Sequence, residues 1–452
     1  MKQKIAALAL VIVLLVVALM KISDVVHDRQ NYRQIAIQSI AQSLAGSQTL
    51  TGPLIHRACT EEWDITNASK EVRSERREFV LAAAPASLTL QGGSKLEPRA
   101  RGLHATQVFN LKASLTAEWT DLEALKPKAE HAGSRMNCGQ PLLMMAVFDA
   151  RGIRHASVKI GEQLLALKPG TFYGSYPRGV HAPLSPALLQ AAPLQAQLEL
   201  ELMGTESISV VPLGGDTRVQ LTSNWPHPSF SGQFLPVDRK VTAEGFEASW
   251  RVSSLASTAQ QDVTQGEAAK RKATCPPYEG SVNNPCVETL SVTFVDPSNT
   301  YALSDRATKY GLLFIGLTFL AVGMFEFMKS LRVHPIQYLL VGAAMSMFFL
   351  LLVSLSEHMP FESAYAVASA ACVLLLAYYA SHMLGHWSRG LPFGLGIATL
   401  YGMLFVLLSM EQTALLLGAV ALFAVLAAIM MLTRRVDWYA RFRQPEAVKA
   451  AG

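Results

Sequence analysis

The amino-acid sequence predicts a membrane protein of the α+β class: an N-terminal transmembrane anchor, a large antiparallel β-rich domain of sandwich type, and a C-terminal bundle of five transmembrane helices. Three observations lead to this prediction. Apolar residues are concentrated in one run near the N-terminus and in most of the chain after Gly311. Between these regions lie short apolar segments that turn residues interrupt. Lysine and arginine gather in alternate loops between the apolar segments, as in proteins that cross a bilayer several times.

Composition and charge exclude some classes of protein. Half of the 452 residues are hydrophobic and 16% are charged, whereas a soluble domain usually has about 25% charged residues. The net charge is +5, but residues 23–310 contain 28 basic and 28 acidic side chains and are formally neutral. Proteins that bind nucleic acids concentrate positive charge on a folded domain. Nucleic acid is therefore not an expected partner.

The first expected membrane segment runs from Ile5 to Met20, between Lys4 and Lys21. A helix of this length rises about 24 Å, so the flanking lysines must extend to the surfaces of a hydrocarbon core about 30 Å thick. A cleavable signal peptide also begins with positive charge and a short apolar run. Because no A-x-A cleavage sequence follows, we expect an uncleaved anchor over residues 1–22.

Five longer apolar segments follow the central region, and each is long enough to cross a bilayer at about 1.5 Å per residue. They predict a five-helix bundle over residues 306–433, followed by a basic tail over residues 434–452. The five segments are Gly311–Met328, Ile336–Leu355, Ser363–Met383, Leu391–Met410 and Thr413–Leu432.

The positions of Lys and Arg predict which ends of these six segments face the cytoplasm. Ten lysines and arginines lie before the first segment, between the second and third, between the fourth and fifth, and after the sixth, while loops 356–360 and 411–412 contain none. Because cytoplasmic loops are enriched in Lys and Arg, we expect both termini in the cytoplasm and the central region outside it. The enrichment of positive charge on the cytoplasmic side is slightly reduced by three residues on the outer side, Lys21, Arg306 and Lys309.

Residues 23–46 are expected to form a juxtamembrane helix. Ile22, Val26 and Ile37 recur on one helical face, which Arg29 interrupts. The helix either packs on the exported domain as a stalk or lies along the membrane, and the stalk is the preferred interpretation.

Residues 47–305 are expected to form the exported β-rich domain. Several segments alternate apolar and polar residues, as in Leu198–Leu202, which is typical of strands with one buried face. Glycine-rich sequences such as Gly92-Gly93 predict turns between them. Residues 257–273 have few apolar side chains and are expected to form an exposed loop.

The positions of the cysteines agree with export to an oxidising compartment. Cys59, Cys138, Cys275 and Cys286 lie in the central region, and Cys372 lies in an apolar segment. An even number of exported cysteines predicts disulfides. Cys275 and Cys286 flank a Pro-rich loop and form the better pair, which leaves Cys59 with Cys138. No C-x-x-C motif occurs, so structural bridges are expected rather than a redox site.

Several motifs resemble those of the CreD family of inner-membrane proteins, in order along most of the chain. The most specific is Leu221–Phe230, which continues through Gly232 to Phe234-Leu235-Pro236. The loops that carry the four exported cysteines resemble the family least. The other matching segments are Leu50–Ile55, Ser304–Tyr310 leading to Phe325-Glu326, His334–Gly342, Ser354–His358 and Asp437–Tyr439.

The resemblance implies Gram-negative bacterial origin. Together with the charge distribution, it predicts a multi-pass protein of the bacterial inner membrane with cytoplasmic termini and a periplasmic domain. It implies a role in cell-envelope integrity. The family name further implies regulation by a two-component system that responds to nutrient state and to envelope or β-lactam stress. It implies no reaction, cofactor or substrate.

The segment Trp225-Pro226-His227-Pro228 is the first candidate site. Two prolines hold it in an extended conformation, so it can present Trp225 and His227 to a ligand or partner. The alternative is a rigid transition from strand to loop, with Trp225 and Phe230 buried as anchors.

Polar residues at the membrane form a second group of candidates. Acidic residues within apolar helices are costly and often functional, but pairing with a nearby lysine or extension to the interface explains Glu326 equally well. The Glu357-His358 pair either relays protons or anchors a loop at the interface. The group consists of Asp305, Arg306, Glu326, Glu357 and His358.

No metal site, cofactor or catalytic site is predicted. His382 and His386 lie on one helix face as two metal ligands do, but no third ligand is nearby. The sequence has no H-E-x-x-H, G-x-S-x-G or P-loop motif. The tail Arg434–Arg443, which includes Trp438 and Tyr439, is expected to contact membrane lipid.

Three functions are consistent with these patterns. The preferred one is a non-enzymatic protein whose exported domain binds envelope components or periplasmic partner proteins and supports envelope integrity under stress. The first alternative is a transporter or channel accessory subunit that uses the C-terminal helices. The second is an enzyme that modifies envelope lipid or peptidoglycan, for which no outward-facing nucleophile can be assembled.

Overall fold

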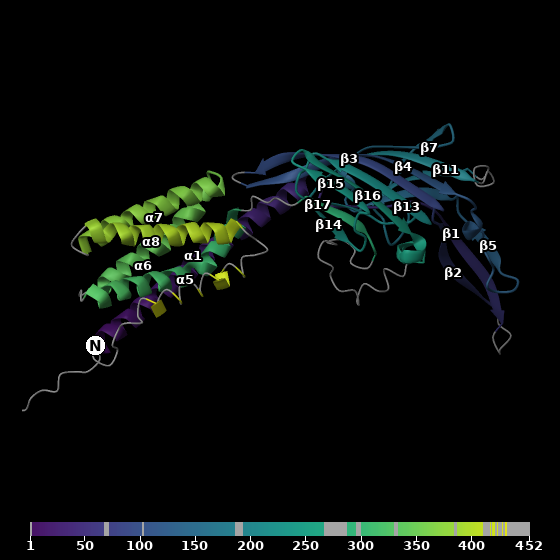
Figure 1. The fold of residues 1–452 in the computed structure, drawn as a ribbon. Helices are drawn as coiled ribbons and strands as arrows, with labels where there is room; N and C mark the ends of the chain where they lie inside the picture. Colours follow the sequence, from purple (N-terminus) through teal and green to yellow (C-terminus); the bar gives the residue numbers. More distant parts are fainter. Residues whose placement is uncertain are drawn as a thin grey trace, which may run out of the picture. The chain divides into compact units, whose positions relative to one another are not determined.

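The computed structural model divides the chain into two compact units (Figure 1). The helical unit comprises Met1–Asn31 and Ser298–Gly452, and the β unit comprises Tyr32–Pro297. The structure describes residues 2–66, 72–101, 104–185, 193–265, 287–294, 300–329, 333–383 and 387–409, with isolated positions between 416 and 431.

Two sheets build the described part of the β unit. Sheet A has the strand order β14 (Pro228–Gly232), β17 (Leu290–Phe294), β12 (Ser207–Val210), β1 (Gln48–Thr66), β6 (Leu142–Val147), β10 (Gly179–Pro183) and β9 (Lys168–Pro169). Two further strands of sheet A pair with β1, namely β2 (Val72–Ala83) and β5 (Arg135–Cys138). Sheet B has the order β15 (Asp238–Thr242), β16 (Gly245–Ser253), β13 (Asp216–Ser223), β3 (Ser87–Arg101), β4 (His104–Trp119), β11 (Leu194–Thr205), β7 (Ile153–Ile160), β8 (Gln163–Leu165).

One hydrophobic core joins the two sheets. In β11 the leucines are buried and the intervening Glu199 is exposed, as the alternating sequence predicts. Trp119 and Phe109 of sheet B lie in the same core as Leu50 and Ile55 of sheet A. The prediction of a large β-rich domain is therefore confirmed.

The prediction that this domain is purely antiparallel is wrong, because both sheets are mixed. β1 runs parallel to β12, with Gln48 opposite Ile208. β3 runs parallel to β13, with Gly93 opposite Thr222. Alternation of apolar residues indicates which face of a strand is buried, but it carries no information about the direction of a distant partner strand.

The expected turn at Gly92-Gly93 is also wrong. Strand β3 passes through both glycines with continuous pairing to β4 on one side and to β13 on the other. Hydrogen bonding to two neighbouring strands overrides the local preference of glycine for turns.

The expected exposed loop over residues 257–273 is corrected in its first part. Residues 259–264 form the helix α3 (Ala259–Thr264), and Ala259 and Val263 are buried because they lie four residues apart on one face. Residues from 266 onward in this loop lie outside the described residues. The short 3-10 helices are η1 (Glu123–Leu125), η2 (Ala150–Gly152) and η3 (Ser254–Ala256).

The helical unit begins with α1 (Lys2–Ser43), whose last residues belong to the β unit. Leu15 and Leu19 of α1 share a core with the other long helices, and Gly342 leaves room for Leu15. Close approach at small residues is typical of helices that pack in membranes. The other helices are α5 (Thr300–Lys329), α6 (Pro335–Ser356), α7 (Phe361–Met383) and α8 (Trp387–Ser409).

Within the described residues, the prediction of five C-terminal spanning helices is corrected to three. Among the described residues, the helices long and apolar enough to cross a membrane are α6, α7, α8 and, near the N-terminus, the Ala6–Ser43 part of α1. Helix α5 covers the expected segment Gly311–Met328, in which Glu326 is the one charged residue, and it is not among the spanning helices found within the described residues. Most of Thr413–Leu432 and all of the basic tail lie outside the described residues.

Candidate functional site

The candidate segment Trp225–Pro228 crosses from one sheet to the other. β13 ends in sheet B at Ser223, and β14 begins in sheet A at Pro228. Trp225 and Phe230 pack against the core, while His227 is exposed. The Trp225 indole N–H donates to the His227 carbonyl oxygen at 3.1 Å. The segment is therefore anchored by its aromatic residues and exposes one imidazole.

Asn224 holds this crossover against β3. Its Oδ1 accepts a hydrogen bond from the Leu96 N–H at 2.8 Å, and its Nδ2 donates to the Leu96 carbonyl at 3.3 Å. One carboxamide thus satisfies both backbone groups of a residue, as a paired strand would. Its position between Ser223 and Trp225 in the resembling motif was the only signal for Asn224 in the sequence.

The candidate polar residues at the membrane fall at two ends of the helical unit. Asp305 and Arg306 lie near the start of α5, and Glu357 and His358 follow the end of α6. Because α5 and α6 are consecutive helices joined by a short connection, these four residues share one end of the unit. Glu326 lies at the other end.

At the first end, Glu357 pairs with α1. The Arg29 Nε lies 3.5 Å from a Glu357 carboxylate oxygen, and the Glu357 side chain is only 11% exposed. This pair explains the arginine that interrupts the apolar face of the juxtamembrane helix. Asp305 pairs with Lys309 at 2.7 Å, and the His358 ring contacts the Ser354 carbonyl at 3.3 Å.

At the other end, Glu326 joins α5 to α6. Its carboxylate accepts hydrogen bonds from the Tyr338 hydroxyl at 3.0 Å and from the Val333 N–H at 3.3 Å. The adjacent His334 and Gln337 form a capping box that begins α6. These contacts connect the end of α5 to the start of α6.

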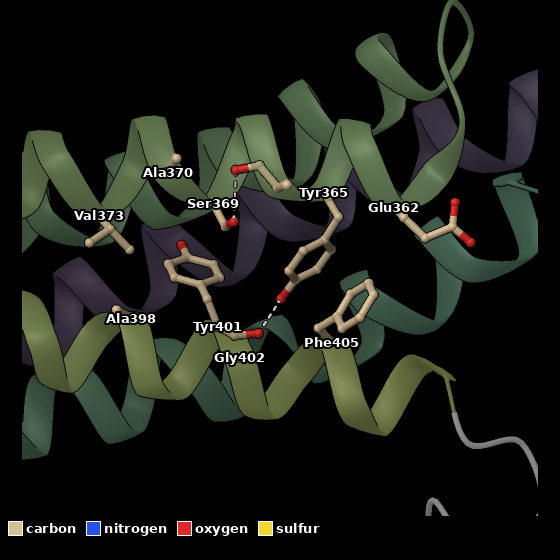
Figure 2. Close-up of a pocket in the computed structure, with 10 residues that line it drawn as sticks. Glu362, Tyr365, Ser369, Ala370, Val373, Ala398, Tyr401, Gly402 and Phe405 are labelled. Carbon is tan, nitrogen blue, oxygen red and sulfur yellow. Dashed lines mark hydrogen bonds between the residues drawn. The ribbon is translucent and has the colours of Figure 1, made fainter.

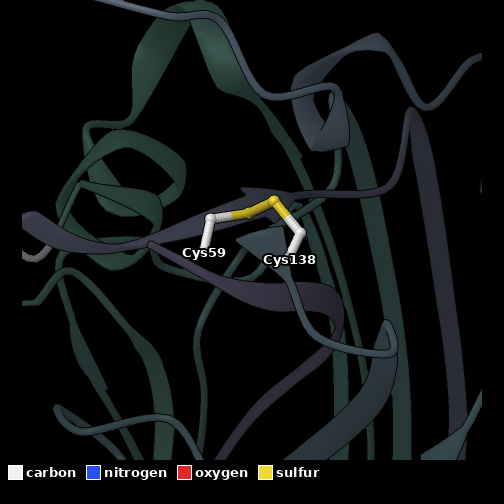
Figure 3. Close-up of a disulfide and its surroundings, with 2 residues drawn as sticks. All are labelled: Cys59 and Cys138. Carbon is white, nitrogen blue, oxygen red and sulfur yellow. A yellow bond between two sulfur atoms is a disulfide. The ribbon is translucent and has the colours of Figure 1, made fainter. Parts of the chain in front are cut away.

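A disulfide fastens a long loop of the β unit to β1 (Figure 3). Cys59 and Cys138 lie directly opposite each other in the pairing of β1 with β5. The bridge closes a segment that we call the strap, residues 120–138, between β4 and the end of β5. The other expected pair, Cys275 and Cys286, lies outside the described residues.

Glu61 of β1 also holds the strap, through hydrogen bonds to its side-chain carboxylate. The carboxylate is fully buried and accepts hydrogen bonds from the His131 N–H at 3.0 Å, the Glu130 N–H at 2.9 Å and the Ser134 hydroxyl at 2.8 Å. These bonds, that of His131 first, lower the pKa of Glu61 to about 2. Trp63 stacks on the His131 ring with centroids 3.8 Å apart.

Two buried histidines hold a neighbouring loop of the β unit. The His56 Nε2 lies 2.8 Å from the Thr171 carbonyl oxygen, and the His181 Nδ1 lies 2.7 Å from the Gly170 carbonyl oxygen. Burial lowers the pKa of His56 below its ordinary value. Neither histidine stood out in the sequence, because a single histidine within a strand has no local pattern.

A cavity of about 400 Å³ lies between α7 and α8 (Figure 2). Its walls combine the rings of Tyr365, Tyr401 and Phe405 with small residues, and Glu362 lies at one end. The Tyr365 hydroxyl donates to the Tyr401 carbonyl at 2.6 Å, so this polar group is satisfied within the wall. An apolar molecule fits this lining better than an ion does.

The possible two-histidine metal site is only half described. His382 Nδ1 contacts the Tyr378 carbonyl at 3.1 Å, and His386 lies outside the described residues. Within the part of the chain that the structure describes, no group of three or more His, Cys, Asp or Glu residues is arranged to hold a metal ion.

Solved structures offer only a weak likeness. An M1 zinc metallopeptidase from Deinococcus radiodurans is 9% identical, with a TM-score of 0.19 over 37% of this chain and 38% of that chain. A substrate-bound variant of that enzyme gives a TM-score of 0.20 over 46% of this chain and 42% of its own. Scores this low support no conclusion about fold or activity.

The sequence comparisons are specific. The family model described as inner membrane protein CreD matches residues 1–439. The inner membrane protein CreD of Escherichia coli K12 is 36% identical over 430 residues, which cover 95% of this chain and 92% of that protein. With matches of this extent, the chain belongs to the CreD family of inner-membrane proteins.

Proposed function

We propose that the protein is a non-enzymatic binding protein whose β unit lies in the periplasm and engages envelope components or partner proteins, in support of envelope integrity. The observation that carries this proposal is the Cys59–Cys138 disulfide in the β unit. Disulfides persist in oxidising compartments such as the bacterial periplasm and are rare in the cytosol. The one-sided distribution of Lys and Arg supports the same orientation.

The contacts of the acidic residues favour binding over catalysis. Glu61 holds the strap, Glu326 joins two helices, and Glu357 pairs with Arg29. A catalytic carboxylate needs a nucleophile or substrate position within hydrogen-bond reach. These three are instead engaged by backbone N–H groups, a tyrosine hydroxyl and a guanidinium, which supports structural roles.

Reporter fusions test the location of the β unit. Alkaline phosphatase, which folds only outside the cytoplasm, should be active when inserted after Thr264. Green fluorescent protein, which does not fluoresce after export in the unfolded state, should fluoresce when inserted between α5 and α6. The reverse pattern would overturn the proposal.

Complementation tests the role of the β unit. A deletion strain should regain resistance to detergent and β-lactam stress with the full chain, but not with an equally abundant chain that lacks residues 47–294. Full rescue by the shortened chain would assign the function to the helices instead.

The cavity between α7 and α8 favours a second candidate, an accessory subunit that handles an apolar molecule within the membrane. In that case Ala370→Phe, which fills the cavity, should abolish complementation at normal abundance. Val367→Phe is the matched control, because Val367 is 51% exposed on the same helix and does not line the cavity. Equal activity of both variants would reject this candidate.

A further inference from the structure

Gly93 has an unusual position in sheet B. It lies on the exposed outer face of β3, between Lys112 of β4 and Thr222 of β13. Glycine weakens the interior of a strand, because it has no side chain to pack and loses more conformational freedom on folding. A glycine at the centre of a sheet therefore calls for a specific reason.

The fold itself supplies no such reason for Gly93. Its strand shows no register shift, and its φ is not in the left-handed region. A Cβ at this position would meet only the Thr222 Oγ1, at an ordinary 3.6 Å. The adjacent Gly92 differs, because its Cβ would lie 3.1 Å from a Leu111 methyl and 3.3 Å from a Leu221 methyl of the core. Packing explains Gly92 and leaves Gly93 unexplained.

A further reason for glycine within a strand is the close approach of a ligand to the backbone. Gly93 forms part of the floor of a hollow of about 420 Å³ on the outer face of sheet B. Four adjacent strands provide the lining side chains, which are Gln91, Lys112, Ser114, Glu199, Gln220 and Thr222.

The polar groups around the hollow are held in position. The Ser114 hydroxyl donates to the Glu199 carboxylate at 2.9 Å. On the other side, the Gln220 amide donates to Glu247 at 2.9 Å. Side chains ordered in this way lose less freedom when they bind a ligand.

The chemistry of the lining selects an uncharged polar ligand. One ammonium group, on Lys112, balances one carboxylate, on Glu199, so the hollow does not favour a polyanion. Amides and hydroxyls offer donors and acceptors side by side, and no aromatic or large aliphatic side chain lines the hollow as an anchor for an apolar peptide side chain. A chain of hydroxyl-bearing rings matches both properties.

We infer that the hollow over Gly93 is a binding site for a neutral oligosaccharide, with one sugar ring against the bare backbone and its hydroxyls bonded to Gln91, Gln220 and Glu199. This inference deepens the proposed function and rests on it for the role of binding in the envelope. Binding by the purified protein can be measured whatever the orientation of the chain in cells. Each of the two proposals can therefore be disproved independently of the other.

The experiment uses the full chain in lipid nanodiscs, because maltoside detergents carry sugars that would compete. Calorimetric titrations with the tetramer of β-1,4-linked N-acetylglucosamine and with cellotetraose should show binding of at least one of them. Gly93→Val should weaken that binding at least tenfold without lowering thermal stability, since a β-branched residue suits a strand. Thr89→Leu, which adds bulk to the same face of β3 outside the hollow, should bind as the wild type does.

A second variant, Gln91→Leu, keeps the test decisive if Gly93→Val folds poorly, and it should weaken binding about fivefold. Absence of binding to both tetrasaccharides would overturn the inference. Unchanged affinity in a folded Gly93→Val variant would overturn it as well. Tighter binding of a heparin tetrasaccharide, lost in Gly93→Val, would show an anion site and would also refute a neutral ligand.

Discussion

Removal of the Cys59–Cys138 disulfide should destabilise the β unit. The bridge joins positions 79 residues apart. In the chain-entropy account, closing a loop of this size is worth about 4.5 kcal/mol at 25 °C, and native bridges usually contribute about 2–4 kcal/mol. We expect the Cys59→Ala/Cys138→Ala variant to lose about 2–4 kcal/mol in the free energy of unfolding.

The double variant is necessary because a single substitution would leave one thiol free to pair with Cys275 or Cys286. Urea unfolding of the full chain in nanodiscs, followed by tryptophan fluorescence, measures the loss. Trp63 stacks on His131 of the strap and reports its release. Cys372→Ala is the control, since Cys372 is a free thiol in α7. If the double variant and the reduced wild-type protein both unfold at the urea midpoint of the oxidised wild type, the disulfide does not stabilise the β unit.

Three further predictions follow from single contacts. Arg29→Gln should lower the melting temperature more than Glu357→Gln does, because the loss of Arg29 leaves the mostly buried Glu357 carboxylate without this partner. The double variant should regain part of the lost melting temperature. Equal losses in the two single variants would contradict the pairing. Glu61→Gln should speed limited proteolysis within the strap about tenfold while the rest of the β unit stays protected; an unchanged cleavage rate would count against it. Burial lowers the pKa of His56, so as the pH falls the unfolded chain binds a proton at His56 before the folded chain does. The urea concentration at the midpoint of unfolding should therefore decrease as the pH is lowered from about 7 to about 5. His56→Gln should make this decrease smaller, and an equal decrease in the variant would contradict the assignment.

Local sequence patterns lose their predictive power where pairing with distant segments decides the structure. Alternation in β11 correctly predicted a strand with one buried face. Gly92-Gly93 predicted a turn, but pairing on both sides made it the middle of a strand. The aromatic residues of the Trp225–Pro228 segment stood out by composition, whereas Asn224 matters through one distant residue, Leu96.

The sequence by itself determined the family, the presence of helices long and apolar enough to cross a membrane, and the β-rich character of the central domain. These properties depend on runs and periods of neighbouring residues, which set how much apolar surface each element buries. Only the tertiary structure decided that β3 lies parallel to β13, that Arg29 meets Glu357, and that Gly93 forms the floor of a polar hollow. Each of these facts joins positions far apart in the chain, and such contacts arise from packing and register across the whole unit rather than from any local pattern.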